Sequence, residues 1–90
     1  MNIEELREEF IELEKLRFNI INCYIMGILK KTDIDRFQQV LQGFREKLYN
    51  FTCTEETILE VAKMKSKVQH FNTEIIEDED VLRMAYSNEF

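Results

Sequence analysis

The chain has 90 residues, of which 44% are hydrophobic and 33% are charged, and its net charge at neutral pH is −6. This hydrophobic fraction is enough for a folded core, which argues against intrinsic disorder, and the length corresponds to one domain. An acidic surface repels phosphate groups, so direct binding to nucleic acid or to an anionic membrane surface is disfavoured. Proline is absent and glycine occurs twice, which argues against a turn-rich β fold and favours helices.

The first predicted element is a helix over residues 3–30. Asn2 and Glu5 have the spacing of an N-terminal capping box. Up to Arg17 the helix has one apolar stripe, and after Arg17 a second stripe joins it, formed by Phe18, Ile21, Ile25 and Ile28. A helix that is apolar on most sides is buried on most sides. We therefore expect the second half of this helix to lie between other helices.

Two further helices are predicted. Lys30 and Lys31 are expected to close the first helix, and Thr32 is expected to cap the second helix after a short connection. Because the connection is short, the first two helices should form an antiparallel hairpin. A third helix is predicted over about residues 55–76, capped by Thr52 or Thr54, with an apolar stripe that includes Ile58 and Val61.

Residues 77–90 form an acidic tail with two alternative structures. Asp78 or Asp80 can cap a short helix, or the third helix can run straight through. The tail also has two functional interpretations: a solvated terminus, or a docking segment whose Val81, Leu82 and Tyr86 enter a groove on a partner protein.

The predicted fold class is all-α, an antiparallel helical hairpin plus a third helix. The resulting three-helix bundle covers residues 1–76, and the tail belongs to the same domain. The expected core residues are Phe10, Leu13, Ile20, Ile21, Tyr24, Phe37, Leu41, Phe44, Leu48, Val61, Val68 and Phe71. Because three helices need not cover every side of residues 18–29, we expect the chain to self-associate, most simply as a C2 homodimer.

The sequence indicates no metal, cofactor or catalytic site, and we do not expect an enzyme. The candidate metal ligands are Cys23, Cys53 and the single histidine, His70, whereas a structural zinc site uses four well-placed ligands. His70 and Glu74 are one helical turn apart and are expected to pair on the helix surface. The Glu-x-x-His motif of di-iron proteins is absent, so the glutamates of the first helix are expected to form a solvated face.

Residues 3–16, IEELREEFIELEKL, resemble the first helix of the all-helical chorismate mutases, which are dimers of three-helix chains. Those enzymes bind a dicarboxylate with several arginines and a lysine. Arg7 and Arg17 lie in the corresponding helix of this chain, but the rest of the pattern is not visible. The resemblance therefore does not extend to that activity.

Residues 18–29, FNIINCYIMGIL, are too few to span a membrane, because a spanning helix needs about 20 apolar residues. The acidic opening MNIEELREEF does not resemble a signal peptide. We therefore expect a cytoplasmic protein in which both cysteines are reduced.

The expected function is that of a non-catalytic protein-interaction module, such as a regulator, inhibitor or adaptor. The candidate partner-binding residues are Phe18, Ile21, Ile25, Ile28, Val81, Leu82 and Tyr86. A small all-helical enzyme is the least favoured interpretation. The main alternative is an acidic mimic of nucleic acid that blocks a nucleic-acid-binding protein. Its acidic surface would comprise Glu4, Glu5, Glu8, Glu9, Glu12, Glu77, Asp78, Glu79 and Asp80.

Overall fold

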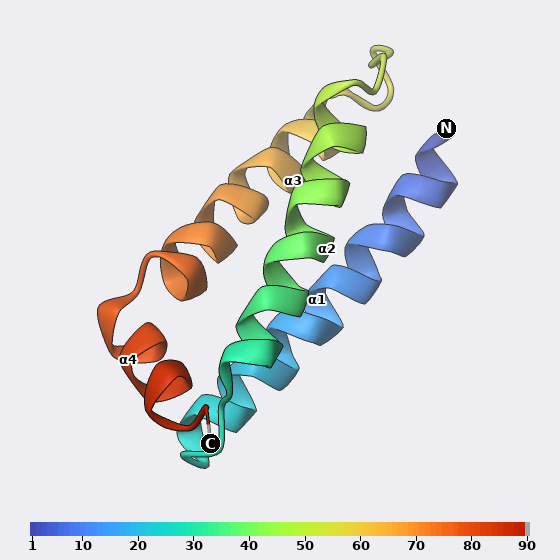
Figure 1. Cartoon of the computed structure of the whole chain (residues 1–90). Coiled ribbons are helices and arrows are strands. Elements are labelled where there is room, and N and C mark those ends of the chain that lie inside the picture. Colours follow the sequence, from blue (N-terminus) through green and yellow to red (C-terminus); the bar gives the residue numbers. More distant parts are fainter. Residues whose placement is uncertain (90) are drawn as a thin grey trace.

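The computed structural model describes residues 1–89, which form an all-helical structure. Four α-helices and one π-helical turn follow in the order α1 (Ile3–Ile25), α2 (Lys31–Tyr49), α3 (Ile58–Phe71), η1 (Asn72–Ile76) and α4 (Glu79–Ser87). The helices α1, α2 and α3 run alternately down and up a rod of 47 × 18 × 18 Å (Figure 1). The predicted all-α class is thus confirmed, and α1 and α2 lie antiparallel, but residues 1–89 form four α-helices rather than three.

The first helix ends earlier than the sequence pattern indicated. Asn2 caps its start as predicted, since the Asn2 side-chain oxygen accepts a hydrogen bond of 2.9 Å from the Glu5 backbone N–H. At the other end Gly27 adopts a left-handed φ of 75°, and the backbone N–H groups of Gly27 and Ile28 donate to the carbonyls of Tyr24 and Cys23. This is the Schellman arrangement that terminates helices. The predicted continuation to residue 30 was therefore wrong.

The starts of α2 and α3 also differ from the prediction. Lys30 and Lys31 do not close α1. Lys30 is the N-cap of α2, and its backbone N–H donates to the Asp33 carboxylate at 3.0 Å. Thr32 lies inside the first turn of α2 instead of capping it. The N-cap of α3 is Thr57 rather than Thr52 or Thr54.

The C-terminal segment forms a separate helix, one of the two alternatives that the sequence left open. After α3 the chain widens into η1, and α4 then begins with Asp78 as its N-cap. One oxygen of the Asp78 carboxylate accepts from the backbone N–H groups of Asp80 and Val81 at 2.9 and 3.0 Å. The predicted helix over residues 55–76 is thus divided into α3 and η1.

The core runs along the axis of the rod, and α2 lies at its centre, packed against α1, α3, η1 and α4. Phe10 of α1 contacts both other long helices. The centre of its ring lies 5.7 Å from that of Phe44 in α2 and 6.2 Å from that of Phe71 in α3. All of the predicted core residues are buried except Ile21 and Tyr24, which are half-buried. The core also includes residues outside that set, namely Leu6, Leu29, Ile34, Met64, Ile75, Val81 and Ala85.

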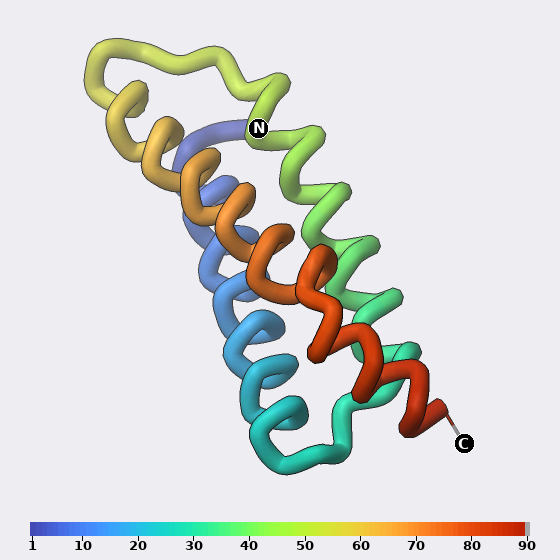
Figure 2. Tube along the Cα trace, turned by 90° about the vertical axis from the view of Figure 1, so that its left-hand side faces the viewer, coloured from blue at the N-terminus to red at the C-terminus, as the bar shows by residue number. Residues whose placement is uncertain are grey.

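The C-terminal half of α1 has fewer neighbours than expected. Its N-terminal half packs on α2 and contacts α3 through side chains such as Arg7 with Glu60, but η1 and α4 lean toward α2 and away from the end of α1 (Figure 2). The end of α4 reaches only the turn after α1, where the Asn88 amide donates to the carbonyls of Gly27 and Leu29 at 3.0 Å. The prediction that the second half of the helix lies between other helices was therefore wrong for the single chain.

Candidate protein-interaction surface

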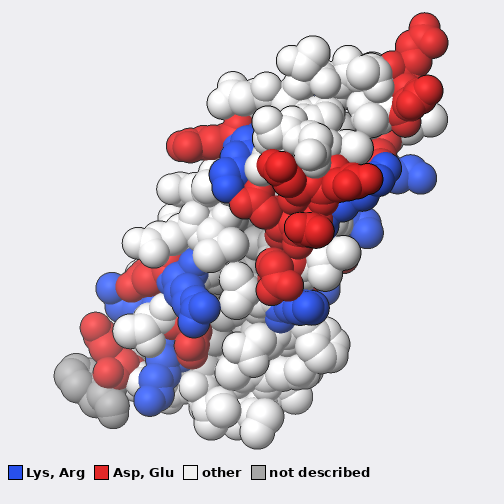
Figure 3. Space-filling model, turned by 90° about the vertical axis from the view of Figure 1, so that its right-hand side faces the viewer, with Lys and Arg blue, Asp and Glu red and all other residues white. Residues whose placement is uncertain are grey.

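An apolar surface covers the end of α1 and the turn that follows it. Phe18 is 64% exposed, Ile25 74%, Met26 69% and Ile28 52%. Ile21 lies among them in sequence and is half-buried. We call these five residues the α1-end surface. Residues 18–29 contain no charged side chain, and the lower right of the molecule in Figure 3 is an uncharged area.

The position of Arg17 explains where this surface begins. Its guanidinium bridges α1 to η1 through hydrogen bonds of 2.9 and 3.1 Å to the two carboxylate oxygens of Glu74, and it lies 5.2 Å from the centre of the Phe71 ring. The predicted pair of His70 with Glu74 is present at 3.1 Å. On the N-terminal side of this cluster, α3 covers α1. On its C-terminal side the chain turns toward α2, so Phe18 and Ile25 of α1 face outward.

The candidate docking residues of the C-terminal segment have different environments. Val81 is buried in the core of the same chain, and Leu82 is half-buried against that core. Only Tyr86 is largely exposed. The side chain of Val81 is therefore not accessible to a partner of the folded chain, and Tyr86 is the one of these three candidates that lies at the outer surface.

The two acidic clusters lie on different parts of the molecule. The glutamates of α1 gather in the middle of the face shown in Figure 3, and Glu77–Asp80 lie at the start of α4 on the opposite side of the rod (Figure 1). Several of the α1 glutamates have partners, such as Glu9 with Lys47 at 2.5 Å and Glu12 with Lys15 at 3.2 Å. The nine predicted acidic residues thus do not form one continuous surface.

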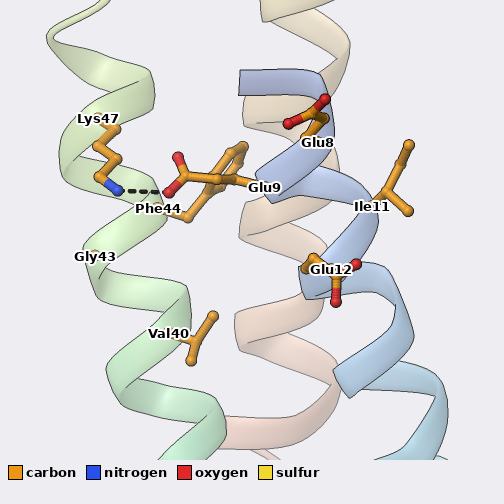
Figure 4. A pocket seen from close by; sticks show the side chains of 8 residues that line it. All are labelled: Glu8, Glu9, Ile11, Glu12, Val40, Gly43, Phe44 and Lys47. Carbon is orange, nitrogen blue, oxygen red and sulfur yellow. Dashed lines mark hydrogen bonds and ion pairs between the residues drawn. The ribbon is translucent and has the colours of Figure 1, made fainter. Parts of the chain in front are cut away.

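A shallow groove of about 660 Å³ separates α1 from α2 (Figure 4). Ile11, Val40 and Phe44 provide its apolar lining, and Gly43 leaves it open, since no atom lies within 4 Å of the place where a Cβ would stand. Glu8, Glu12 and the Glu9–Lys47 pair form its polar edge. The groove thus combines an apolar lining with an edge that is mainly acidic.

The arginines of the chorismate-mutase resemblance are both held by carboxylates of this chain. Arg17 is bound to Glu74 as described, and the Arg7 guanidinium donates two hydrogen bonds of 2.6 and 2.7 Å to Glu60. The hydrogen bonds from Arg7 hold the pKa of Glu60 below its ordinary value, and they raise that of Arg7. These arginines therefore join α1 to α3 and η1 rather than converging on an open anion site.

Neither a metal centre nor a membrane-spanning helix is found in the described part of the chain. Among residues 1–89, no three His, Cys, Asp or Glu side chains come together in a way that could hold an ion. No helix in this range is long and apolar enough to cross a bilayer. Cys23 near the end of α1 and Cys53 in the connection between α2 and α3 are free, half-buried thiols.

The sequence prediction missed two exposed apolar positions next to the predicted stripe. Met26 extends the α1-end surface into the turn, and Ile11 is exposed one heptad before Phe18. The seven-residue spacing of Ile11, Phe18 and Ile25 is a signal that could have identified Ile11. Comparison of the chain with protein-family models, with curated proteins and with solved structures gives no match.

Proposed function

We propose that this chain is a non-catalytic protein-interaction module that binds through the α1-end surface, as a small regulator, inhibitor or adaptor does. The observation that carries the proposal is the exposure of Phe18 and Ile25, at 64% and 74%, within a segment without charge. Large contiguous exposed apolar patches are rare on monomers and mark interaction sites. Covering these side chains removes them from water, which favours binding.

The test is affinity capture with two matched variants. The double change Phe18→Gln/Ile25→Gln removes apolar side chains from the surface, and the control Ile58→Gln/Leu59→Gln changes two similarly exposed residues at the start of α3. Both variants should remain folded because the altered side chains are outside the core, which circular dichroism checks. We expect the first variant alone to lose its partners. Equal capture by both variants would show that this surface is not the binding face.

The second candidate function is an acidic mimic that blocks a nucleic-acid-binding protein. It is supported by the glutamates on the exposed side of α1, where Glu4, Glu8 and Glu12 are all exposed. Binding by such a surface weakens steeply as salt rises, because charge attraction provides the affinity. If a partner binds with an affinity that changes neither with salt nor with Glu4→Gln/Glu8→Gln, this function is ruled out. Binding through the α1-end surface then remains.

A further inference from the structure

The α1-end surface has the spacing of a helix-pairing stripe. Phe18, Ile21 and Ile25 follow each other at intervals of three and four residues, which places them on one side of the helix. On the same side of α1, nearer its N-terminus, α3 covers the helix. There Arg7 pairs with Glu60 and Glu14 pairs with Lys67 of α3. The stripe therefore lies where the chain's own third helix is no longer present, and it has the form of a site for another helix.

The exposed area of the chain is consistent with a missing neighbour. The surface of the chain is 6307 Å² at a mass of 10.9 kDa, whereas a compact monomer of that mass exposes about 5,600 Å². The radius of gyration is 14.3 Å, against about 12 Å for a compact chain of this length. If two chains each cover a surplus of ~700 Å², the interface buries ~1,400 Å², which is within the usual size range of specific interfaces.

We propose that a second copy of this chain covers the α1-end surface, with the two α1 helices antiparallel. This inference rests on the proposed function, because it names the occupant of the same surface. In this arrangement Ile21 of each chain faces Ile25 of the second copy, and Phe18 faces the turn residues Met26 and Ile28 of the second copy. The contact is closed under twofold symmetry, since each contact is repeated in reverse by the same residues of the other copy.

The charge distribution selects the antiparallel orientation. A parallel pair would place Glu14, one turn before Phe18, against Glu14 of the second copy, and it would align the acidic N-terminal halves of the two α1 helices. Like charges at such positions repel one another. In the antiparallel pair the acidic halves point away from the contact in opposite directions, tens of Å apart, well beyond a screening length of about 8–10 Å.

Sedimentation velocity over a wide concentration range tests the self-association. We expect the wild-type chain to be a dimer at about 100 μM, with a dissociation constant in the micromolar range expected of a small interface. The variant Phe18→Gln/Ile25→Gln should raise that constant by ~30-fold or more. The control Ile58→Gln/Leu59→Gln should leave it within about threefold. A monomeric wild type at about 1 mM, or an equal effect of the two variants, would overturn the proposal.

Spin labels at residue 8 test the orientation. The label is placed by Glu8→Cys in a Cys23→Ala/Cys53→Ala background that is first shown to sediment like the wild type. At 1.5 Å of rise per residue, the antiparallel register separates the two labels by ~45 Å along the helix axis. A parallel pair with axes about 8–10 Å apart would hold them within ~25 Å, and that short distance would refute the antiparallel arrangement.

The outcomes for self-association and for partner binding can be told apart. A chain that is monomeric at every concentration but loses its captured partners on Phe18→Gln/Ile25→Gln refutes the second-copy proposal and supports the proposed function. A chain that dimerises through this surface, but whose captured partners are unaffected by the same change, supports the dimer and refutes capture of other proteins through this surface.

Discussion

Replacing Gly27 with alanine tests the turn that ends α1 and presents the α1-end surface. Gly27 has a φ of 75° and lies between the last turn of α1 and Ile28. No atom lies within 4 Å of the position that an alanine Cβ would occupy. The cost of the change therefore comes from the backbone conformation alone and not from a clash.

The magnitude follows from two opposing effects. An L-residue in the left-handed conformation costs about 1–2 kcal/mol, and replacing glycine reduces the entropy of the unfolded chain, which returns about 0.4–1 kcal/mol. We therefore expect Gly27→Ala to lower the free energy of unfolding by about 1 kcal/mol. For a domain of this size, that corresponds to a fall in Tm of roughly 4–8 °C.

Gly43 provides the matched control, because it lies inside α2 and also has open space around its missing Cβ. Alanine is favoured over glycine in a helix interior, so Gly43→Ala should raise the free energy of unfolding by about 0.5–1 kcal/mol. Urea denaturation followed by circular dichroism at a single protein concentration measures both variants, which keeps any self-association equal. A stability change of the same sign in both variants would refute the assignment of Gly27 as the helix-terminating residue.

Three further predictions concern the contacts that hold the helices together. The hydrogen bonds from Arg7 lower the pKa of Glu60 in the folded chain below its ordinary value of 4.5. The ionised carboxylate therefore stabilises the fold above that pH, and this stabilisation is lost as the pH falls through the lower folded pKa. Glu60→Gln should flatten the decline in unfolding free energy that urea titrations measure between about pH 5 and 3. Asn88→Ala removes the two hydrogen bonds to the α1–α2 turn and should cost about 1 kcal/mol in urea unfolding, and no loss would mean that the end of α4 does not hold the turn. Glu74→Gln weakens the bridge between α1 and η1 and should cost about 1–2 kcal/mol, whereas Glu12→Gln, at an exposed pair, should stay within about 0.5 kcal/mol.

Periodicity predicted the core well wherever a helix has neighbours on its apolar side. The three- and four-residue spacing of Phe37, Leu41, Phe44 and Leu48 identifies the buried side of α2, and all four residues are buried. The spacing is reliable here because α2 is the central helix, packed against α1, α3, η1 and α4. For such a helix, the pattern of one sequence segment is sufficient.

The sequence pattern failed at helix ends, where a single backbone conformation outweighs periodicity. Gly27 lies within the predicted helix over residues 3–30, but glycine is also the residue that most readily takes the left-handed conformation at a helix C-terminus. The lysines at 30 and 31 suit a helix C-terminus by charge, yet Asp33 accepts from the Lys30 backbone and begins α2. Gly27 is therefore a stronger indicator of the end of α1 than the charges of the two lysines.

The exposure of Phe18 and Ile25 could not be read from α1 alone, because it depends on where the third helix stops covering them. Arg17 appeared in the sequence as an interruption of the apolar stripe, and in the structure it binds Glu74 of η1 at the level where the chain departs toward α2. The hydrophobic effect would favour covering the residues beyond this bridge. Val81 and Ala85 of α4 are buried against the rest of the chain instead. The apolar side of α4 is thus already occupied, so α4 leaves the end of α1 exposed, and in the proposed dimer the second copy covers it.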